Sequence, residues 1–249
     1  STMKLKSKTR AFYNLSLFKK ILILVVIYST GVQNIRSEQT RYAFEAITND
    51  KGLTHNTVFD ICQDAKGFMW IATDGGLNRY DGKNIKQYFS QTHAHSLPSN
   101  SISSLVLASD DKLFIGTSNG LALYKPETDD FDNIYYNQKP LGEIMSLQQG
   151  IGAEILISTD NRGSFIYNYE KKEFKPLIFL KERIYGMTVD KEGFYWAFSR
   201  FTLYRLNKKG SIVADYHVSP QLFNTAISCI KSDKKGTLWI GTFEKLLKS

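Results

Sequence analysis

Residues 67–82 read Gly-Phe-Met-Trp-Ile-Ala-Thr-Asp-Gly-Gly-Leu-Asn-Arg-Tyr-Asp-Gly, and residues 236–242 read Gly-Thr-Leu-Trp-Ile-Gly-Thr. Both stretches run from a glycine through tryptophan, isoleucine and a small residue to threonine, although they lie far apart in the chain. Internal similarity at a fixed period is the sequence signature of a repeat architecture. The number and spacing of further copies therefore decide the fold.

Five copies of this phrase follow one another at nearly constant spacing. Counted on the aromatic or large apolar residue before the core position, the intervals are 44, 42, 40 and 43 residues. The aligned residues are Trp70, Phe114, Leu156, Trp196 and Trp239. Such regular spacing indicates one structural unit that is repeated five times.

The surroundings of each copy repeat as well. An apolar-rich run that favours a strand comes before each phrase, at residues 57–62, 101–107, 143–147, 184–189 and 226–230. In four copies, turn-forming residues lie between this apolar run and the repeated phrase, as in Asp64-Ala-Lys-Gly67 and Asp233-Lys-Lys-Gly236. A tyrosine-bearing segment follows in four copies. Each unit is thus about four short strands in about 40 residues, which is typical of a β-propeller blade.

We therefore predict an all-β protein, a β-propeller of four-stranded blades with about five blades present and no helix outside residues 1–36. A blade must cover both of its faces, so the repeated tryptophan and isoleucine should pack between neighbouring blades. Residues 42–47, which read Tyr-Ala-Phe-Glu-Ala-Ile, favour a further strand. Two arrangements remain open: this strand completes the fifth blade of a closed ring, or the blades are part of a larger ring.

The first 36 residues differ from the rest in charge. They hold seven basic residues and no acidic one, with the apolar run 21–28 after the basic stretch and small residues at 29–31. This layout is typical of a secretory signal peptide. The alternative is a retained membrane anchor, although the apolar run is about half the ~20 residues that a spanning helix needs.

The net charge of +8 comes mostly from this leader. Removing its seven basic residues leaves 25 of the 32 lysines and arginines against 24 acidic residues. The predicted propeller, residues 37–249, is nearly neutral. The sequence therefore predicts no nucleic-acid contact by this region, because binding to a run of phosphates needs a cationic surface.

The motifs of several copies resemble a known family. Residues 52–58 (Gly-Leu-Thr-His-Asn-Thr-Val) together with 64–82, and residues 97–102 together with 114–121, are similar to the two-component regulator propeller repeat. The fifth copy fits up to Thr242, and the third and fourth are degenerate. The resemblance covers residues from about 42 to 249.

The resemblance implies the N-terminal part of the periplasmic sensor of a hybrid two-component system, with blades that belong to a seven-bladed ring. Sensors of this family respond to breakdown products of complex glycans, and the full-length protein is a histidine kinase in the inner membrane. For this chain it implies a sensor domain that is incomplete at its C-terminus, an oligosaccharide ligand and a homodimer formed by the full-length sensor. Membrane contact would come only from the leader or from a helix beyond residue 249.

Little in the sequence points to catalysis. It contains no nucleophile elbow and no phosphate loop, and we expect no catalytic residue, metal or cofactor. His93 and His95 precede a loop sequence and read as loop histidines. The adjacent acids Asp110–Asp111 and Asp129–Asp130 read as turn residues. Cys62 and Cys229 favour two small buried residues, with a disulfide as the alternative in an exported protein.

A propeller usually offers ligands the mouth of its central channel, which is formed by the linkers into the first strands and the turns between second and third strands. The predicted ligand-binding residues at these places are His55, Asn56, Asp74, Asn100, Asn119, Arg162 and Arg200. They are polar and suited to hydrogen bonds with a sugar, and the two arginines would suit an acidic one. Two other functions stay open, an extracytoplasmic lyase or glycoside-processing enzyme and a scaffold for protein assembly.

Overall fold

The computed structural model describes residues 43–178, 180, 182–217 and 226–249. The chain divides into two compact units, Ser1–Glu45 and Ala46–Ser249, and every helix and strand given below belongs to the second unit. The predicted signal peptide or anchor, residues 1–36, lies outside the described residues. So does Tyr42.

Five antiparallel sheets follow one another along the chain, and in each sheet the strands pair in sequence order. Blade 1 holds β1 (Val58–Gln63), β2 (Met69–Thr73), β3 (Gly76–Tyr80) and β4 (Ile85–Tyr88). Blade 2 holds β5 (Ile102–Leu107), β6 (Leu113–Thr117), β7 (Gly120–Lys125), β8 (Asp130–Tyr136) and β9 (Lys139–Pro140). Blade 3 holds β10 (Ile144–Gln149), β11 (Glu154–Thr159), β12 (Ser164–Asn168) and β13 (Glu173–Pro176).

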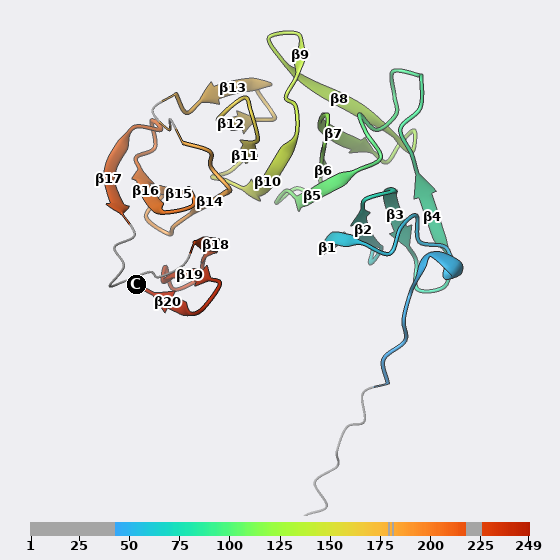
Figure 1. Cartoon of the computed structure of the whole chain (residues 1–249). Coiled ribbons are helices and arrows are strands. Elements are labelled where there is room, and N and C mark those ends of the chain that lie inside the picture. The colour runs from blue at the N-terminus through green and yellow to red at the C-terminus, as the bar shows by residue number, and fades with distance from the viewer. Residues whose placement is uncertain (1–42, 179, 181, 218–225) are drawn as a thin grey trace, which may run out of the picture. The chain divides into compact units, whose positions relative to one another are not determined.

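Blade 4 holds β14 (Gly186–Val189), β15 (Tyr195–Phe198), β16 (Thr202–Leu206) and β17 (Ile212–His217). Blade 5 holds β18 (Ile227–Ser232), β19 (Leu238–Thr242) and β20 (Leu246–Lys248). The first strands of consecutive blades contact one another, β1 with β5, β5 with β10, β10 with β14 and β14 with β18. Figure 1 shows these first strands on the inside and the fourth strands on the outside, as in a β-propeller. The predicted all-β fold of five consecutive blades is confirmed.

Three details of the prediction need correction. Blade 2 has a fifth strand, because Asn137 and Gln138 form a tight turn with positive φ and return the chain as β9. The three-residue 3-10 helix η1 (Asn49–Lys51) lies outside residues 1–36. Residues 43–47 form no strand, and the side chain of Phe44 is 96% exposed. The segment predicted to complete the fifth blade is therefore coil over its described residues, and the larger ring stays a prediction.

The repeated phrase is the second strand of every blade, and in blades 1 to 4 its aligned residue faces the next blade along the chain. Trp70 of blade 1 packs in one hydrophobic cluster with Ile102 and Leu105 of blade 2. Phe114 packs toward blade 3 and Leu156 toward blade 4 in the same way. The following isoleucine faces backward: Ile115 belongs to the cluster shared with blade 1. The predicted packing between neighbours is confirmed.

Each tryptophan of the phrase has an aspartate six residues earlier. The indole Nε1–H of Trp70 donates to Asp64 Oδ2 at 2.8 Å, and Trp196 and Trp239 do the same to the aspartates at 190 and 233. The other carboxylate oxygen of Asp64 accepts two backbone N–H groups of its hairpin turn. Where the phrase has no indole, positions 108 and 150 are alanine and glycine. The aspartate is thus present where an indole N–H needs an acceptor.

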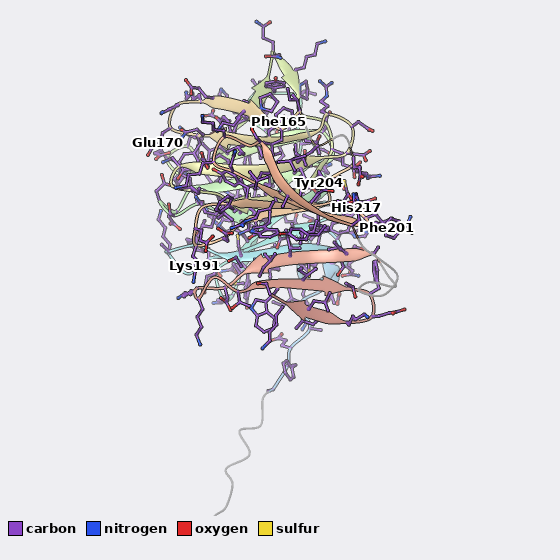
Figure 2. All side chains as sticks on the ribbon, turned by 90° about the vertical axis from the view of Figure 1, so that its left-hand side faces the viewer. Phe165, Glu170, Lys191, Phe201, Tyr204 and His217 are labelled. Atoms are coloured by element: carbon purple, nitrogen blue, oxygen red, sulfur yellow. The ribbon has the colours of Figure 1, made fainter. Side chains whose placement is uncertain are left out.

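The blades have two ends, which Figure 2 shows at opposite edges of the molecule. We call the end with the linkers into the first strands and the turns between second and third strands the entry end. Phe201 and His217 lie there. The opposite hairpin end carries the turns between first and second and between third and fourth strands, with Lys191 and Glu170. Every candidate site belongs to one of these ends or to the space between two blades.

Candidate functional site

The topology places all seven predicted ligand-binding residues at the entry end. Four of them lie in turns between second and third strands of blades 1 to 4, and three lie in segments that lead into β1 and β5. All seven side chains are exposed: His55, Asn56, Asp74, Asn100, Asn119, Arg162 and Arg200. No hydrogen bond or ion pair within the described residues joins two of them directly. Their role in ligand binding stays a prediction.

Several of these side chains are already used by the loops. Asp74 Oδ1 accepts a hydrogen bond at 2.6 Å from the hydroxyl of Ser101 in the next blade. Asn100 Oδ1 accepts the backbone N–H of Ser90, and Asn56 exchanges hydrogen bonds with Asn49. These contacts hold linkers and neighbouring blades together. Part of the polar character that suggested sugar binding is therefore explained by the entry loops themselves.

His55 and Asn119 also have local partners. His55 Nδ1 lies 3.0 Å from the backbone N of Thr57, and Asn119 Nδ2 lies 3.5 Å from the carbonyl oxygen of Pro98. The remaining two, Arg162 and Arg200, make no side-chain hydrogen bond or ion pair with any described residue. The guanidinium of Arg200 lies over the ring of Phe201 at 5.2 Å. These two arginines keep their donors available for an anionic group.

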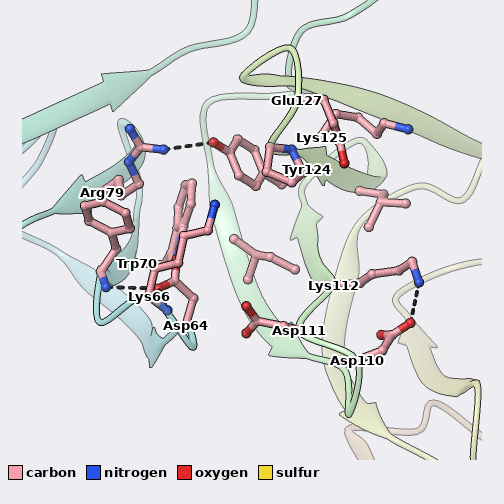
Figure 3. Close-up of a pocket in the computed structure, with 14 residues that line it drawn as sticks. Asp64, Lys66, Trp70, Arg79, Asp110, Asp111, Lys112, Tyr124, Lys125 and Glu127 are labelled. Carbon is pink, nitrogen blue, oxygen red and sulfur yellow. Dashed lines mark hydrogen bonds and ion pairs between the residues drawn. The ribbon is translucent and has the colours of Figure 1, made fainter.

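A cleft of about 370 Å³ opens at the hairpin end between blades 1 and 2, where sequence reasoning placed no site (Figure 3). Charged side chains of both signs surround it together with aromatic rings. Among its lining residues are Lys66, Trp70, Arg79, Lys112, Tyr124 and Glu127. We call it the blade 1–2 cleft.

Most charges in this cleft are satisfied by other protein groups. Asp64 accepts from the indole of Trp70, and Lys112 pairs with Asp110. Asp111 Oδ1 accepts the backbone N–H of Ala65 across the two blades at 3.0 Å. A bound molecule would have to compete with these contacts. The cleft is therefore better explained as a seam that joins the blades than as a ligand site.

The seam continues from Arg79 and Tyr124, which line the cleft, to the carboxylate of Asp129. Its Oδ1 accepts hydrogen bonds from the hydroxyls of Tyr88 at 2.7 Å and Tyr124 at 2.6 Å, and its Oδ2 pairs with Lys86. Arg79 Nη1 donates to the Tyr124 hydroxyl at 2.8 Å. Tyr88, Lys86 and Arg79 come from blade 1, so this network fastens the outer strands of the two blades.

The network changes the acidities of its members. Burial raises the pKa of Asp129, but hydrogen bonds from Lys86, Tyr124 and Tyr88 outweigh it and lower the pKa to about 2. Burial, and next the hydrogen bond to Asp129, raise the pKa of Tyr124 to about 12 and also raise that of Tyr88. The carboxylate is held charged and the phenols neutral. Asp129 was predicted only as a turn residue; its turn is confirmed, with φ +57°, but it also joins two blades.

The remaining candidate residues from the sequence are two histidines and two cysteines. His93 and His95 lie in the loop between β4 and β5, as predicted, and His95 Nδ1 is 3.7 Å from Asp132. Within the described ranges, no group of three histidine, cysteine or acidic side chains is placed to hold a metal ion. Both cysteines are free. Cys62 is half-buried, which raises the pKa of its thiol to about 12, but Cys229 is exposed, so its predicted burial is wrong.

The comparison with protein families identifies the repeats. The model of the two-component regulator propeller matches residues 52–75 and 221–244, so these two stretches are repeats of that family. A histidine kinase, "Histidine kinase P4" of Formosa agariphila, is 33% identical over 64 residues. The match covers 26% of this chain and 5% of that protein.

Solved structures with the same fold include extracellular domains of hybrid two-component systems. Those of BT3049 and BT4673 from B. thetaiotaomicron have TM-scores of 0.71 and 0.70 at 23% and 18% identity. Each match covers 84% of this chain, which spans 30% and 32% of those domains. A streptogramin B lyase has a TM-score of 0.62 at 13% identity, with 80% of this chain and 70% of the lyase covered. The resemblance recognised in the sequence is confirmed.

Proposed function

We propose that this propeller is a non-catalytic recognition module of a hybrid two-component sensor and that it works outside the cytoplasm. Its ligand is an oligosaccharide released from complex glycans, and the signal passes to a kinase beyond this chain. The observation that carries the proposal is the match of two-component regulator propeller repeats in the first and last described blades. The shared fold of extracellular sensor domains supports it.

The entry end offers the chemistry for an acidic ligand group. Arg162 and Arg200 come from corresponding turns of blades 3 and 4, and neither guanidinium makes a hydrogen bond or ion pair with a described residue. Arginine binds carboxylates through two parallel hydrogen bonds, which gives geometric specificity as well as affinity. A ligand held by turns of two blades makes contacts that depend on how the blades are arranged. It can bias a homodimer of sensors only by binding one arrangement better than another.

The proposal is tested with the intact protein, a transcriptional reporter and a panel of oligosaccharides. The double variant Arg162→Ala/Arg200→Ala should raise the activating concentration at least about fivefold, within the usual range of coupling between sites. Lys66→Ala/Lys83→Ala removes two exposed cations from the hairpin end and serves as the matched control. Unchanged sensitivity of the arginine variant at normal protein level would place the ligand elsewhere.

The same experiment examines Asp74 separately. Because its carboxylate binds Ser101 of the next blade, Asp74→Ala should lower stability as well as any affinity for ligand. A melting curve of this variant separates the two effects. A triple variant with alanine at Asp74, Arg162 and Arg200 would not separate a loss of stability from a loss of affinity. The arginine double variant is therefore the cleaner test.

An enzyme is the alternative, and the likeness of fold to a streptogramin B lyase is the observation in its favour. The two proposals differ in one measurable property. Incubation of the purified protein with each oligosaccharide of the panel, followed by chromatography of the products, should show no turnover. Cleavage or elimination in any sample would overturn the non-catalytic proposal. A scaffold for protein assembly would show neither turnover nor an effect of sugars on the reporter.

A further inference from the structure

A second cleft, of about 520 Å³, lies between blades 2 and 3. Its volume is in the range of small-molecule sites in proteins. One wall comes from β8 and the loop before β5, and the other from β12, β13 and the turn between them. We call it the blade 2–3 cleft.

Aromatic rings line both walls. Tyr135 of β8 is 53% exposed, whereas Tyr167 and Tyr169 of blade 3 are buried. The ring of Tyr167 stacks on Phe174 with centroids 4.4 Å apart, which fixes that wall. Tyr135 has no ring contact among the described residues. Its face is free to stack on the apolar side of a ligand ring.

The charges of the cleft leave one cation unpaired. Lys112 pairs with Asp110 and lies over the ring of Tyr169, and His95 and Lys125 both lie 3.7 Å from Asp132. Lys172 makes no ion pair and no side-chain hydrogen bond with any residue that the structure describes. It therefore gives the cleft a positive charge that is free to pair with an anion.

The backbone of Lys172 supports a role for this side chain. Its φ of +56° lies in the left-handed region, which favours glycine and is unusual for lysine. In the longer turn between the third and fourth strands of blade 4, the residue with positive φ is Gly210, at +83°. A residue that keeps an unfavourable conformation next to a cleft points to a function of its side chain.

We propose that the blade 2–3 cleft binds an acidic sugar residue of an oligosaccharide. The sugar ring lies against Tyr135, and the acidic group pairs with Lys172. The shared chemistry of the ligand is a pyranose ring with an anionic substituent, either a carboxylate or a sulfate ester. This site rests on the proposed recognition of oligosaccharides but not on signalling. The cleft would bind such a sugar whether or not the protein passes a signal to a kinase.

The test is calorimetric titration of the full chain with four probes. These are a galacturonic acid tetrasaccharide, a sulfated galactose tetrasaccharide, the neutral galactose tetrasaccharide and inorganic sulfate. At least one acidic tetrasaccharide should bind at least about tenfold more tightly than the neutral one, as expected when a charged group gains a partner. The two acidic probes decide between carboxylate and sulfate.

Two variants test the residues. Lys172→Gly should remove the preference for the acidic probe, and because glycine suits this φ, its melting temperature should not fall. Tyr135→Ala should weaken both acidic and neutral tetrasaccharides at least about fivefold, as for truncation of an aromatic contact residue. The matched controls are Lys171→Gly, the next lysine of the same turn, and Tyr216→Ala, an exposed tyrosine on the outer strand of blade 4.

The outcomes separate the explanations. Binding of inorganic sulfate as tight as that of the sulfated sugar would mean an adventitious ion only and would overturn the proposal. So would an equal loss of affinity in Lys171→Gly, because the effect would then be general attraction by positive charge. Failure of the chain to bind either acidic tetrasaccharide also overturns it, whereas an unresponsive reporter concerns signalling and leaves this binding result untouched.

Discussion

Asp129 and Lys172 occupy corresponding places in neighbouring blades, yet they do opposite things. Each is the last residue of the turn between the third and fourth strand, each has a φ near +57°, and each faces the preceding blade. Asp129 binds two tyrosines and a lysine and closes the blade 1–2 seam. Lys172 binds no described residue and lines an open cleft. The same repeat position thus joins the outer strands of blades 1 and 2 but leaves an unpaired cation beside a cleft between blades 2 and 3.

The largest effect on stability is expected for Asp129→Asn. Asparagine keeps the shape and tolerates the positive φ, but it loses the charge that Lys86 and the two tyrosines bind. We expect the free energy of unfolding to fall by about 2 kcal/mol at neutral pH, since hydrogen bonds to charged groups are the stronger ones. Urea unfolding measures it. Asp132→Asn, whose two ion pairs are both 3.7 Å long, should change stability by less than about 0.5 kcal/mol.

Acid should loosen the same seam. The pKa of Asp129 is about 2 in the fold against an ordinary value of 3.8, so the charged carboxylate stabilises the fold above pH 4. This stabilisation is lost as the pH falls from about 4 to about 2, and after allowance for solvent screening it amounts to about 1–2 kcal/mol. Urea unfolding at a series of pH values should show a shallower acid loss in Asp129→Asn. If stability fell equally steeply with falling pH in the variant and in the unsubstituted protein, Asp129 would not be a cause of the acid sensitivity.

The interface between blades 1 and 2 can be compared with that between blades 2 and 3 by removing one tyrosine hydroxyl from each. The Tyr124 hydroxyl donates to Asp129 and accepts from Arg79, whereas the Tyr169 hydroxyl makes one longer bond, 3.2 Å, to Asp110. We expect Tyr124→Phe to cost about 1–1.5 kcal/mol and Tyr169→Phe less than about 0.5 kcal/mol. Thermal melts of the two variants give the difference. Equal costs would mean that the seams are fastened alike.

The smallest expected effect is a gain. Lys172→Gly relieves the left-handed backbone but adds freedom to the unfolded chain, so the net increase in stability should be about 0.5 kcal/mol. Lys171→Gly, made in the same turn, should destabilise slightly instead, because there the native φ is not positive. Chemical unfolding of both variants side by side measures the contrast. A loss of stability in Lys172→Gly would mean that its side chain supports the fold rather than a ligand.

The sequence predicts the blades because their determinants are local. The phrase around Trp70 and the turn at Asp64 form one hairpin, and their constant spacing predicts it, although the bond between the indole and the carboxylate is visible only in the structure. Neighbour packing follows from the two faces of the second strand. The entry-end residues could be placed for the same reason, because topology alone decides at which end a turn lies.

The seam and the cleft could not be predicted in this way. Whether Asp129 or Lys172 finds a partner depends on side chains about 40 residues earlier, in the preceding blade, and on the exact course of its outer strand. The coil at residues 43–47 and the exposure of Cys229 also depend on what packs against them. The sequence pattern of one blade does not show which side chains of the neighbouring blade will lie opposite it.

The sequential pairing of every sheet has a consequence for how this protein acquires its structure. Each strand that the structure describes pairs only with neighbours in the chain, so a blade can form once about 40 residues are available. Short loops close quickly, and folds dominated by them form faster than folds with distant pairings. Each new blade then docks on a finished one, as in linear repeat arrays whose stability is a sum of units and interfaces. A chain that emerges progressively can therefore assemble in order of synthesis.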